Sequence, residues 1–314
     1  MIILFVFSAF RSVTFIGDTS NYAIRYNLGE EYFYEYMSEG KGEPLYSYLN
    51  IICLRYGIPF QYIIIVFSLI TSLFTLWAIS RTSKKDIMWG LAIYILLTFY
   101  MYSYNASRQM LSASILLCGY TFLKENKYII YIIMVIIATA FHGTSYIAII
   151  VILLQYFRKL KIPTWLVIVF VAVSFIIGSL NLLIPYTSLV GKYGSSGLEL
   201  TRSGFHINLL LYSIFFLYCY VETKEKEDLY LKIYFIGIIL MNIFSYSVVT
   251  MRIAYMFTPI QILLFLRFLR LPQYKNLLIF VTAYCTIVYY YMAISASTAL
   301  LAYEFCSLND LGIQ

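Results

Sequence analysis

Charge is scarce in this chain. Only 12% of its 314 residues are Asp, Glu, Lys or Arg, and only two are His. Soluble domains carry about 25% charged residues, so this chain has too little charge to cover an aqueous surface. It also lacks a P-loop, a dinucleotide-binding glycine motif, an HExxH motif and a CxxC pair. These absences argue against a soluble nucleotide-binding domain, and we expect neither a cofactor nor a metal site.

The five cysteines are too dispersed to form a disulfide framework. They are Cys53, Cys118, Cys219, Cys285 and Cys306. Their number is odd, and no histidine lies close to them in sequence. Most fall inside apolar runs, where a free cysteine behaves as a small apolar residue. We therefore predict that they pack, and that they bind no metal.

Apolar residues dominate instead. Hydrophobic types make up 62% of the chain, and the mean hydropathy is +0.81. Several apolar runs reach the roughly 20 residues that a bilayer core requires. Lipid permits only helices or closed barrels, and continuous apolar runs lack the alternation of barrel strands. The sequence predicts an all-α, polytopic integral membrane protein. Residues 1–10 are expected to form its first span, because they lack the features of a removable signal.

Basic residues set the expected topology. Lys and Arg gather in clusters between apolar runs, and the positive-inside rule places each cluster in the cytoplasm. The clusters lie at residues 81–85, 124–127, 158–161, 224–232 and 267–275. Alternation between them gives about eleven transmembrane helices in a single domain, residues 1–314, with the N-terminus inside and the C-terminus outside.

One apolar stretch has to cross twice or turn back. Residues 128–157 lie between two cytoplasmic clusters. As one helix they would be about 45 Å long, too long for a hydrocarbon core of roughly 30 Å. The natural break is at Phe141-His142-Gly143-Thr144-Ser145. We predict a broken or re-entrant helix pair with His142 at its outer turn.

Two long loops are expected outside. Residues 17–59 interleave tyrosines with acidic residues, a composition that suits carbohydrate, because sugar rings stack on aromatic rings and present hydroxyls to carboxylates. Within this loop Glu43 and Pro44 open a short apolar run, residues 45–56. We predict a partly immersed helix there, with proline in its first turn. The second loop, residues 185–205, is rich in glycine and serine.

The predicted topology brings ionisable residues from distant parts of the chain to the outer face. They are Asp18, Glu43, Arg108, His142, Arg202 and Arg252. Arginine suits phosphate because its planar fork stays charged and pairs with two oxygens at once. Histidine can act as a base near neutral pH, and carboxylates can accept protons or hold sugar hydroxyls. The set predicts a site for a lipid-borne diphosphate. Arginines that reach lipid headgroups and a histidine that only caps a turn are the alternatives, and they stay open.

A series of short motifs is ordered along residues 11–255. Arg11 is followed by Gly17-Asp18-Thr19-x-Asn21-Tyr22 and by Glu43-Pro44; then come Asn105-x-x-Arg108-Gln109, Phe141-His142-x-x-Ser145 and Arg252-x-x-Tyr255. In order and spacing these motifs resemble the EpsG-like family of Wzy-type polysaccharide polymerases, from bacterial capsule and exopolysaccharide loci.

The resemblance implies a metal-independent glycosyltransferase in the bacterial cytoplasmic (inner) membrane, multi-pass and with its active face outward. Its substrate would be a polyprenyl-diphosphate-linked oligosaccharide repeat unit. The growing chain would move from its lipid to the non-reducing end of a new lipid-linked unit, which releases polyprenyl diphosphate. A chain-length regulator and a flippase of the same pathway are candidate partners, and no nucleic acid is expected.

Roles for the candidate residues follow from this interpretation. Arg108 and Arg252 would hold the donor diphosphate and stabilise it as it leaves, and Arg202 would close over it. The base would be His142 or Asp18, with His142 favoured because the helix break directs it into a cavity. The remaining substrate-binding candidates are Tyr22, Gln109 and Glu43, the last of which would position sugar or orient an arginine.

Other classes of protein fit the sequence less well. A flippase or exporter of lipid-linked sugars needs polar residues through the whole membrane depth, and the span centres here are almost purely apolar. A related O-antigen ligase would share the donor chemistry and stays an alternative. An O-acyltransferase that takes cytoplasmic acyl-CoA would need catalytic residues on the inner face, where the chain has mainly Lys and Arg.

Overall fold

The regular structure is helical wherever the computed structural model describes the chain. The described residues are 1–13, 18–40, 42–157, 159–180, 182, 207–245, 251–270, 274–290 and 303–312. All their regular elements are helices, and an isolated antiparallel bridge joins Arg11 to Phe305. The all-α prediction is therefore confirmed.

The chain divides into two compact units. The first comprises Met1–Ile149 with Phe280–Gln314, and the second comprises Ile150–Ile279. The expectation of a single transmembrane domain stays a prediction.

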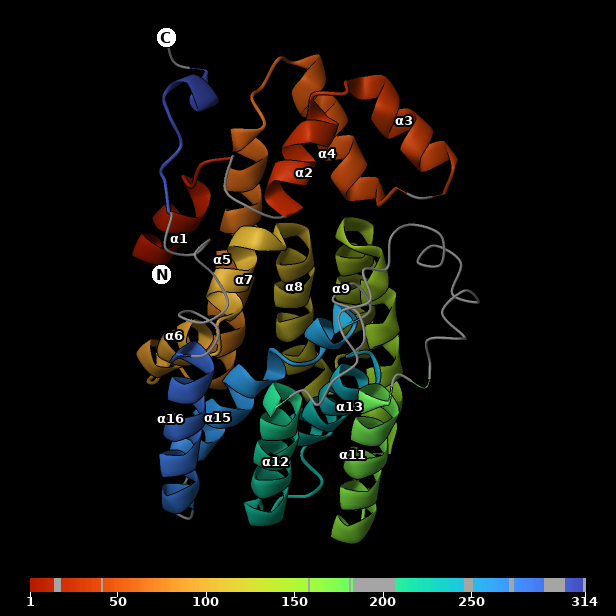
Figure 1. Cartoon of the computed structure of the whole chain (residues 1–314), viewed down its shortest axis with the longest axis vertical. Coiled ribbons are helices and arrows are strands. Elements are labelled where there is room, and N and C mark those ends of the chain that lie inside the picture. The colour runs from red at the N-terminus through yellow and green to blue at the C-terminus, as the bar shows by residue number, and fades with distance from the viewer. Residues whose placement is uncertain are drawn as a thin grey trace. The chain divides into compact units, whose positions relative to one another are not determined.

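The first unit contains most of the predicted site residues. Its helices up to the predicted break are α1 (Ile2–Ala9), α2 (Asp18–Tyr26), α3 (Glu30–Ser38), α4 (Pro44–Arg55), α5 (Gln61–Thr82), α6 (Ile87–Leu96), α7 (Phe99–Asn105), α8 (Ser107–Lys124) and α9 (Tyr128–Phe141). Figure 1 shows α2, α3 and α4 gathered at one end of the unit's longer helices. This end also holds the start of α8, where Arg108 lies.

α8 is the central helix of the first unit. Every residue from 107 to 123 is buried, and the helix packs against α5 and α9. Small residues permit this close packing: a Cβ added to Gly119 would lie 3.2 Å from the ring of Tyr131. Ser112 donates a hydrogen bond to the carbonyl oxygen of Ala138 at 2.9 Å, which links α8 to α9.

The chain breaks at His142 as predicted. α9 ends at Phe141, and His142 adopts an extended conformation with φ −150° and ψ 109°. A 3-10 helix, η1 (Gly143–Ile150), follows and leads into α10 (Val151–Tyr156). The hydroxyl of Tyr131 donates to the carbonyl oxygen of Ala148 at 2.6 Å. This bond ties α9 to η1 and holds the two arms of the break together.

The segment 17–59, which the sequence predicts to be an outer loop, is more helical than expected. The expected short helix is confirmed as α4, with Pro44 at its first turn and Glu43 extended before it. α2 and α3 are additional elements. Phe33 of α3 is fully buried, and its ring packs edge-on against Tyr46 of α4 at a centroid distance of 6.0 Å. The loop therefore has a small aromatic core of its own.

One predicted span is bent. The sequence predicts a single helix over residues 86–104, but α6 and α7 meet at an angle of 58°. Thr98, between them, has a left-handed backbone with φ 62°. A residue in that conformation cannot continue a right-handed helix, so the axis changes direction there.

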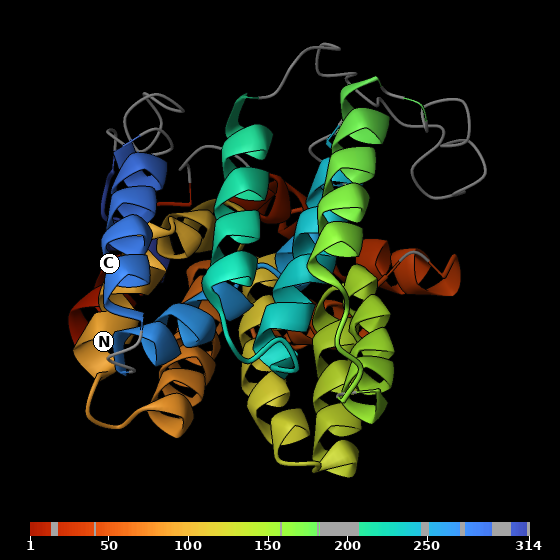
Figure 2. The same ribbon diagram turned by 90° about the horizontal axis from the view of Figure 1, so that it is seen from below.

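The second unit is built mainly on α11 (Thr164–Ser179), α12 (Ile207–Glu222) and α13 (Leu229–Ile243), which contact one another and lie side by side in Figure 2. Asn242 joins all three helices: its Nδ2 lies 3.1 Å from Ser174 Oγ and 2.9 Å from Ser213 Oγ. In a bilayer the hydrophobic effect does not drive helices together, because lipid tails are as apolar as the helices. Buried side-chain hydrogen bonds such as these help to hold the helices together instead. The unit continues through η3 (Ala254–Met256) and α15 (Ile260–Arg270), and α16 (Lys275–Tyr290) spans the boundary between the units.

Helix length limits what can cross a bilayer alone. Among the described residues, α5 has 22 residues and is long and apolar enough, and α6 with α7 qualifies as one bent span. The remaining apolar helices of this set have 10–17 residues. The count of about eleven transmembrane helices stays a prediction.

Candidate functional site

Arg108 is the centre of a buried polar cluster in the first unit. It lies in the first turn of α8 and is only 7% exposed. Its Nη1 donates to Oε2 of Glu43 at 3.1 Å, and Glu43 is only 9% exposed. A charge this buried needs a charged partner, and Glu43 provides one from the residue that precedes α4.

Two tyrosine rings contact the guanidinium group of Arg108. Its carbon Cζ lies 4.3 Å from the ring centroid of Tyr22 and 4.1 Å from that of Tyr46. The two centroids are 5.9 Å apart, too close for rings on opposite faces, so they line adjacent sides of the group. Rings at this distance attract a cation through their quadrupole. The Nε atom of Arg108 is buried and makes no hydrogen bond within the described part of the chain.

Glu43 also contacts the break after α9. Its second oxygen, Oε1, accepts a hydrogen bond from the backbone N–H of Gly143 at 3.4 Å. One carboxylate therefore connects the start of α8 with the residue that follows His142. Both ring nitrogens of His142 are buried. Of the two roles predicted for Glu43, this geometry fits the orienting of an arginine.

The end of α7 fixes the start of α2. Asn105 Oδ1 accepts a hydrogen bond from the backbone N–H of Asp18 at 2.8 Å, and Thr19 Oγ1 donates to the carbonyl oxygen of Tyr104 at 2.7 Å. Tyr22 lies one turn further along α2. Two of the motifs found in the sequence therefore meet directly, and their contact sets the position of the ring against Arg108.

The predicted site residues fall into three groups. Arg108 contacts both Tyr22 and Glu43 directly. Gln109 follows Arg108 in the sequence, and His142 precedes Gly143, whose N–H binds Glu43. Asp18 is held through its backbone by Asn105. Arg252 belongs to the second unit, where its carbonyl oxygen accepts a hydrogen bond from the N–H of Tyr255 at 3.2 Å. Arg202 lies outside the described residues, as does the whole loop 185–205. The expected partnership of Arg252 and Arg202 with Arg108 stays a prediction.

Tyr46 is a site residue that the sequence did not single out. It was one of many tyrosines in residues 17–59, yet it is only 1% exposed and contacts Arg108. Burial raises the pKa of its hydroxyl, against the charge of Arg108, which lowers it. Its spacing of three residues from Glu43 was no signal, because Glu43 is extended before α4 and that spacing makes two side chains neighbours only within a helix.

Arg11 has a different environment from Arg108. It is fully buried and donates to the carbonyl oxygen of Ser8, to Ser68 Oγ at 3.4 Å and to the carbonyl oxygen of Ser103 at 3.5 Å. These acceptors belong to α1, α5 and α7, and the backbone of Arg11 bridges to Phe305. Its contacts join separate segments of the first unit, which is a structural role.

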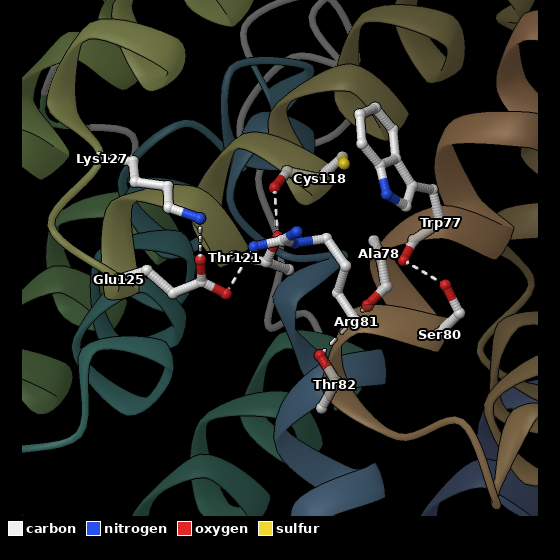
Figure 3. Close-up of polar contacts among 9 residues, drawn as sticks. All are labelled: Trp77, Ala78, Ser80, Arg81, Thr82, Cys118, Thr121, Glu125 and Lys127. Atoms are coloured by element: carbon white, nitrogen blue, oxygen red, sulfur yellow. Dashed lines mark hydrogen bonds and ion pairs between the residues drawn. The ribbon is translucent and has the colours of Figure 1, made fainter.

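A second polar cluster lies at the opposite, C-terminal end of α8 (Figure 3). Arg81 at the end of α5 donates to Thr121 Oγ1 at 2.8 Å and forms an ion pair with Glu125, which also pairs with Lys127 at 2.7 Å. The Arg81 guanidinium lies 3.9 Å from the ring centroid of Phe122. These contacts fasten α5 to α8 at the end expected to face the cytoplasm.

The helical fold, its apolar composition and the buried cluster define a class: a helical membrane protein with an arginine–carboxylate–tyrosine cluster at the start of α8. The comparison with protein-family models narrows this class. A model described as the EpsG family matches residues 1–306, and the chain belongs to the EpsG family. The membership indicates a polysaccharide polymerase-type role in exopolysaccharide biosynthesis, and the resemblance found in the motifs is confirmed. Neither the search of the curated proteins nor that of the solved structures gives a match.

Proposed function

We propose that this protein polymerises polyprenyl-diphosphate-linked oligosaccharide repeat units at the outer face of the bacterial cytoplasmic membrane. The observation that carries the proposal is the environment of Arg108. A guanidinium group that is buried, held by Glu43 and flanked by two tyrosine rings keeps a fixed orientation. A fixed planar fork is suited to phosphoryl oxygens, and family membership supplies the biosynthetic context.

The proposed reaction is a glycosyl transfer. A hydroxyl group at the non-reducing end of a new lipid-linked unit attacks the anomeric carbon of the growing chain. The bond between that carbon and the donor diphosphate breaks, and polyprenyl diphosphate leaves with the bonding electrons. Negative charge builds on the diphosphate in the transition state, so a preorganised cation beside it lowers the barrier. Arg108 has that role in the proposal.

The attacking hydroxyl has to lose its proton. His142 is the favoured base, because it occupies the break whose next residue, Gly143, is held by Glu43. Asp18 is the alternative, since its backbone is fixed by Asn105 three residues before Arg108. In the case of His142, a base one residue from the backbone group that Glu43 binds would couple proton removal to leaving-group stabilisation.

Exposed tyrosines of the same loop are suited to the sugar. Tyr48 and Tyr56 are 54% and 75% exposed. Aromatic rings at a surface offer flat apolar faces with a polar edge, which matches the faces and hydroxyls of a sugar ring. We assign this surface to the oligosaccharide portion of the substrates.

Reconstitution tests the proposed function. The purified protein in detergent receives the lipid-linked repeat unit extracted from a producing strain that lacks this protein, with EDTA and without nucleotide. A ladder of repeat multiples that is lost in Arg108→Ala is the expected result. Arg55→Ala is the matched control, because Arg55 is an exposed arginine of the same loop. A folded wild type that forms no ladder but moves the lipid across vesicle membranes would identify a transporter instead.

A further inference from the structure

Arg25 lies beside the Arg108 cluster, although none of the motifs along the sequence includes it. It is on α2, three residues after Tyr22, whose ring contacts Arg108. Residues with this spacing are neighbours on a helix surface. The Arg25 guanidinium carbon also lies 6.0 Å from the ring centroid of Tyr36 on α3. Arg25 therefore sits at the edge of the face by which α2 covers the cluster.

The charges of both arginines affect the pKa of two tyrosine hydroxyls. Burial raises the pKa of Tyr36 and of Tyr46, whereas the positive charges of Arg108 and Arg25 lower each of them. The negative charge of Glu43 acts on the same two hydroxyls and raises their pKa. Because such effects fall off with distance, Arg25, Arg108 and Glu43 belong to one electrostatic site.

The charges of this site do not cancel. Glu43 pairs with Arg108 at 3.1 Å. The Arg25 side chain forms no ion pair or hydrogen bond within the described part of the chain, and it is half-buried. Arg55, the other arginine of the outer loop, differs: it pairs with Glu30 at 3.1 Å and with the hydroxyl of Tyr34 at 2.9 Å. Arg25 thus leaves the site with a positive charge that solvent can reach.

We propose that Arg25 and Arg108 form a two-cation site for a diphosphate, in which each guanidinium group binds one phosphoryl group. The inference rests on the proposed function and names the second cation of that same site. A diphosphate carries charge on both phosphoryl groups, so one arginine already paired with Glu43 compensates only part of it. Arg108 binds with its remaining buried donors, including Nε, and Arg25 binds the phosphoryl group nearer to solvent.

Binding of a short diphosphate tests this assignment. Wild type, Arg25→Gln, Arg25→Lys and Arg55→Gln are purified in detergent, and their melting temperatures are compared to confirm folding. Farnesyl diphosphate and farnesyl monophosphate are titrated against each. Arg25→Gln should weaken diphosphate binding at least about tenfold, because it removes charge-assisted hydrogen bonds, and it should weaken monophosphate binding much less. Arg55→Gln should bind both ligands as wild type does.

Arg25→Lys keeps the assignment testable if Arg25→Gln does not fold. It retains the charge and loses the fork, so its affinity for the diphosphate should fall between those of wild type and Arg25→Gln. A folded Arg25→Gln protein that binds the diphosphate with wild-type affinity would overturn the two-cation site. If only Arg25→Lys folds, wild-type affinity in that variant would overturn it. An equal loss in Arg25→Gln and Arg55→Gln would also overturn it, since it would report only the net charge of the loop.

A lipid headgroup offers the same phosphate chemistry, and nanodiscs separate the two sources. If Arg25 binds a headgroup, Arg25→Gln lowers the melting temperature in phosphatidylglycerol discs but not in phosphatidylcholine discs, and diphosphate affinity does not change. That result overturns the inference. The proposed function fails separately: wild type then binds farnesyl diphosphate through Arg25 yet forms no polymer. Conversely, a polymer ladder with unchanged diphosphate affinity in Arg25→Gln refutes the site and leaves the function standing.

Discussion

The Nη1 atom of Arg108 lies 3.1 Å from Oε2 of Glu43, and neither side chain is more than 11% exposed. The pair joins the start of α8 to the start of α4, and the second oxygen of Glu43 extends the link to Gly143. Three segments that are far apart in the sequence are thus held by one carboxylate. In the proposed function the stability of the site and its chemistry would depend on the same contact.

Removal of either partner of this pair should destabilise the protein strongly. Glu43→Gln and Arg108→Gln each leave a buried charge without its counterion, a loss of roughly 3–5 kcal/mol. The double variant should lose less than the two single losses combined, because the second substitution removes the stranded charge. Thermal unfolding in detergent measures all three. Glu30→Gln is the control: in its ion pair the side chain of Arg55 is 59% exposed and that of Glu30 is 30% exposed, and an ion pair in contact with solvent contributes little to stability. A Glu43→Gln protein that melts with wild type would refute the structural role of the pair.

Lysine should not replace arginine at position 108. Arg108→Lys keeps one positive charge near Glu43 but loses the planar group that contacts Tyr22 and Tyr46. We expect polymer yield to fall at least about tenfold, because a point charge cannot pair with two phosphoryl oxygens in a fixed geometry. The ladder from the reconstituted reaction measures this, with folding checked by melting temperature. Full polymer length and yield in Arg108→Lys would contradict the assignment of Arg108 to the diphosphate.

Local signals were sufficient for part of this architecture. Pro44 after an extended Glu43 predicted the start of α4, and the excessive length of residues 128–157 predicted the break at His142. The bend at Thr98 was missed because the residue has a left-handed backbone, a conformation that glycine or asparagine would have signalled and threonine does not.

The site itself was only partly predictable. The topology predicted from the sequence places Asp18, Glu43, Arg108 and His142 at the same membrane face. Which of these residues contact one another depends on the path of α2 and α3. Those helices have no long apolar stripe, since α2 buries only Thr19, Tyr22 and Tyr26. Tyr46 and Arg25 therefore could not be told apart from the other tyrosines and arginines of the loop by sequence alone.

Gly178 should be intolerant of any side chain. A Cβ at this position would lie 1.8 Å from the carbonyl oxygen of Asn242 on α13, so Gly178→Ala must push α11 and α13 apart. Overpacking of this kind usually costs about 1–3 kcal/mol, and here it would also disturb the bonds of Asn242 to Ser174 and Ser213. Melting temperature and folded yield in detergent measure the effect. Ser179→Ala, one residue further on, is the control and should behave as wild type; an equal response of the two variants would refute the close approach.

The cluster around Glu125 should make stability depend on pH in a defined direction. The pKa of Glu125 is held below its ordinary value of 4.5, first by the hydrogen bond from Lys127. Burial opposes this and raises the pKa, and the charge and hydrogen bond of Arg81 lower it further. A carboxyl group whose pKa is lower in the folded state stabilises that state fully above its unfolded pKa, and the contribution is lost as the pH falls through the folded value. The difference in melting temperature between wild type and Glu125→Gln should therefore be constant from about pH 7 to about pH 5 and shrink toward about pH 3. Lys127→Gln should reduce the same pH dependence, because it removes the largest cause of the shift. A difference that grows as the solution is acidified would show that Glu125 is not held in its charged form by these two cations.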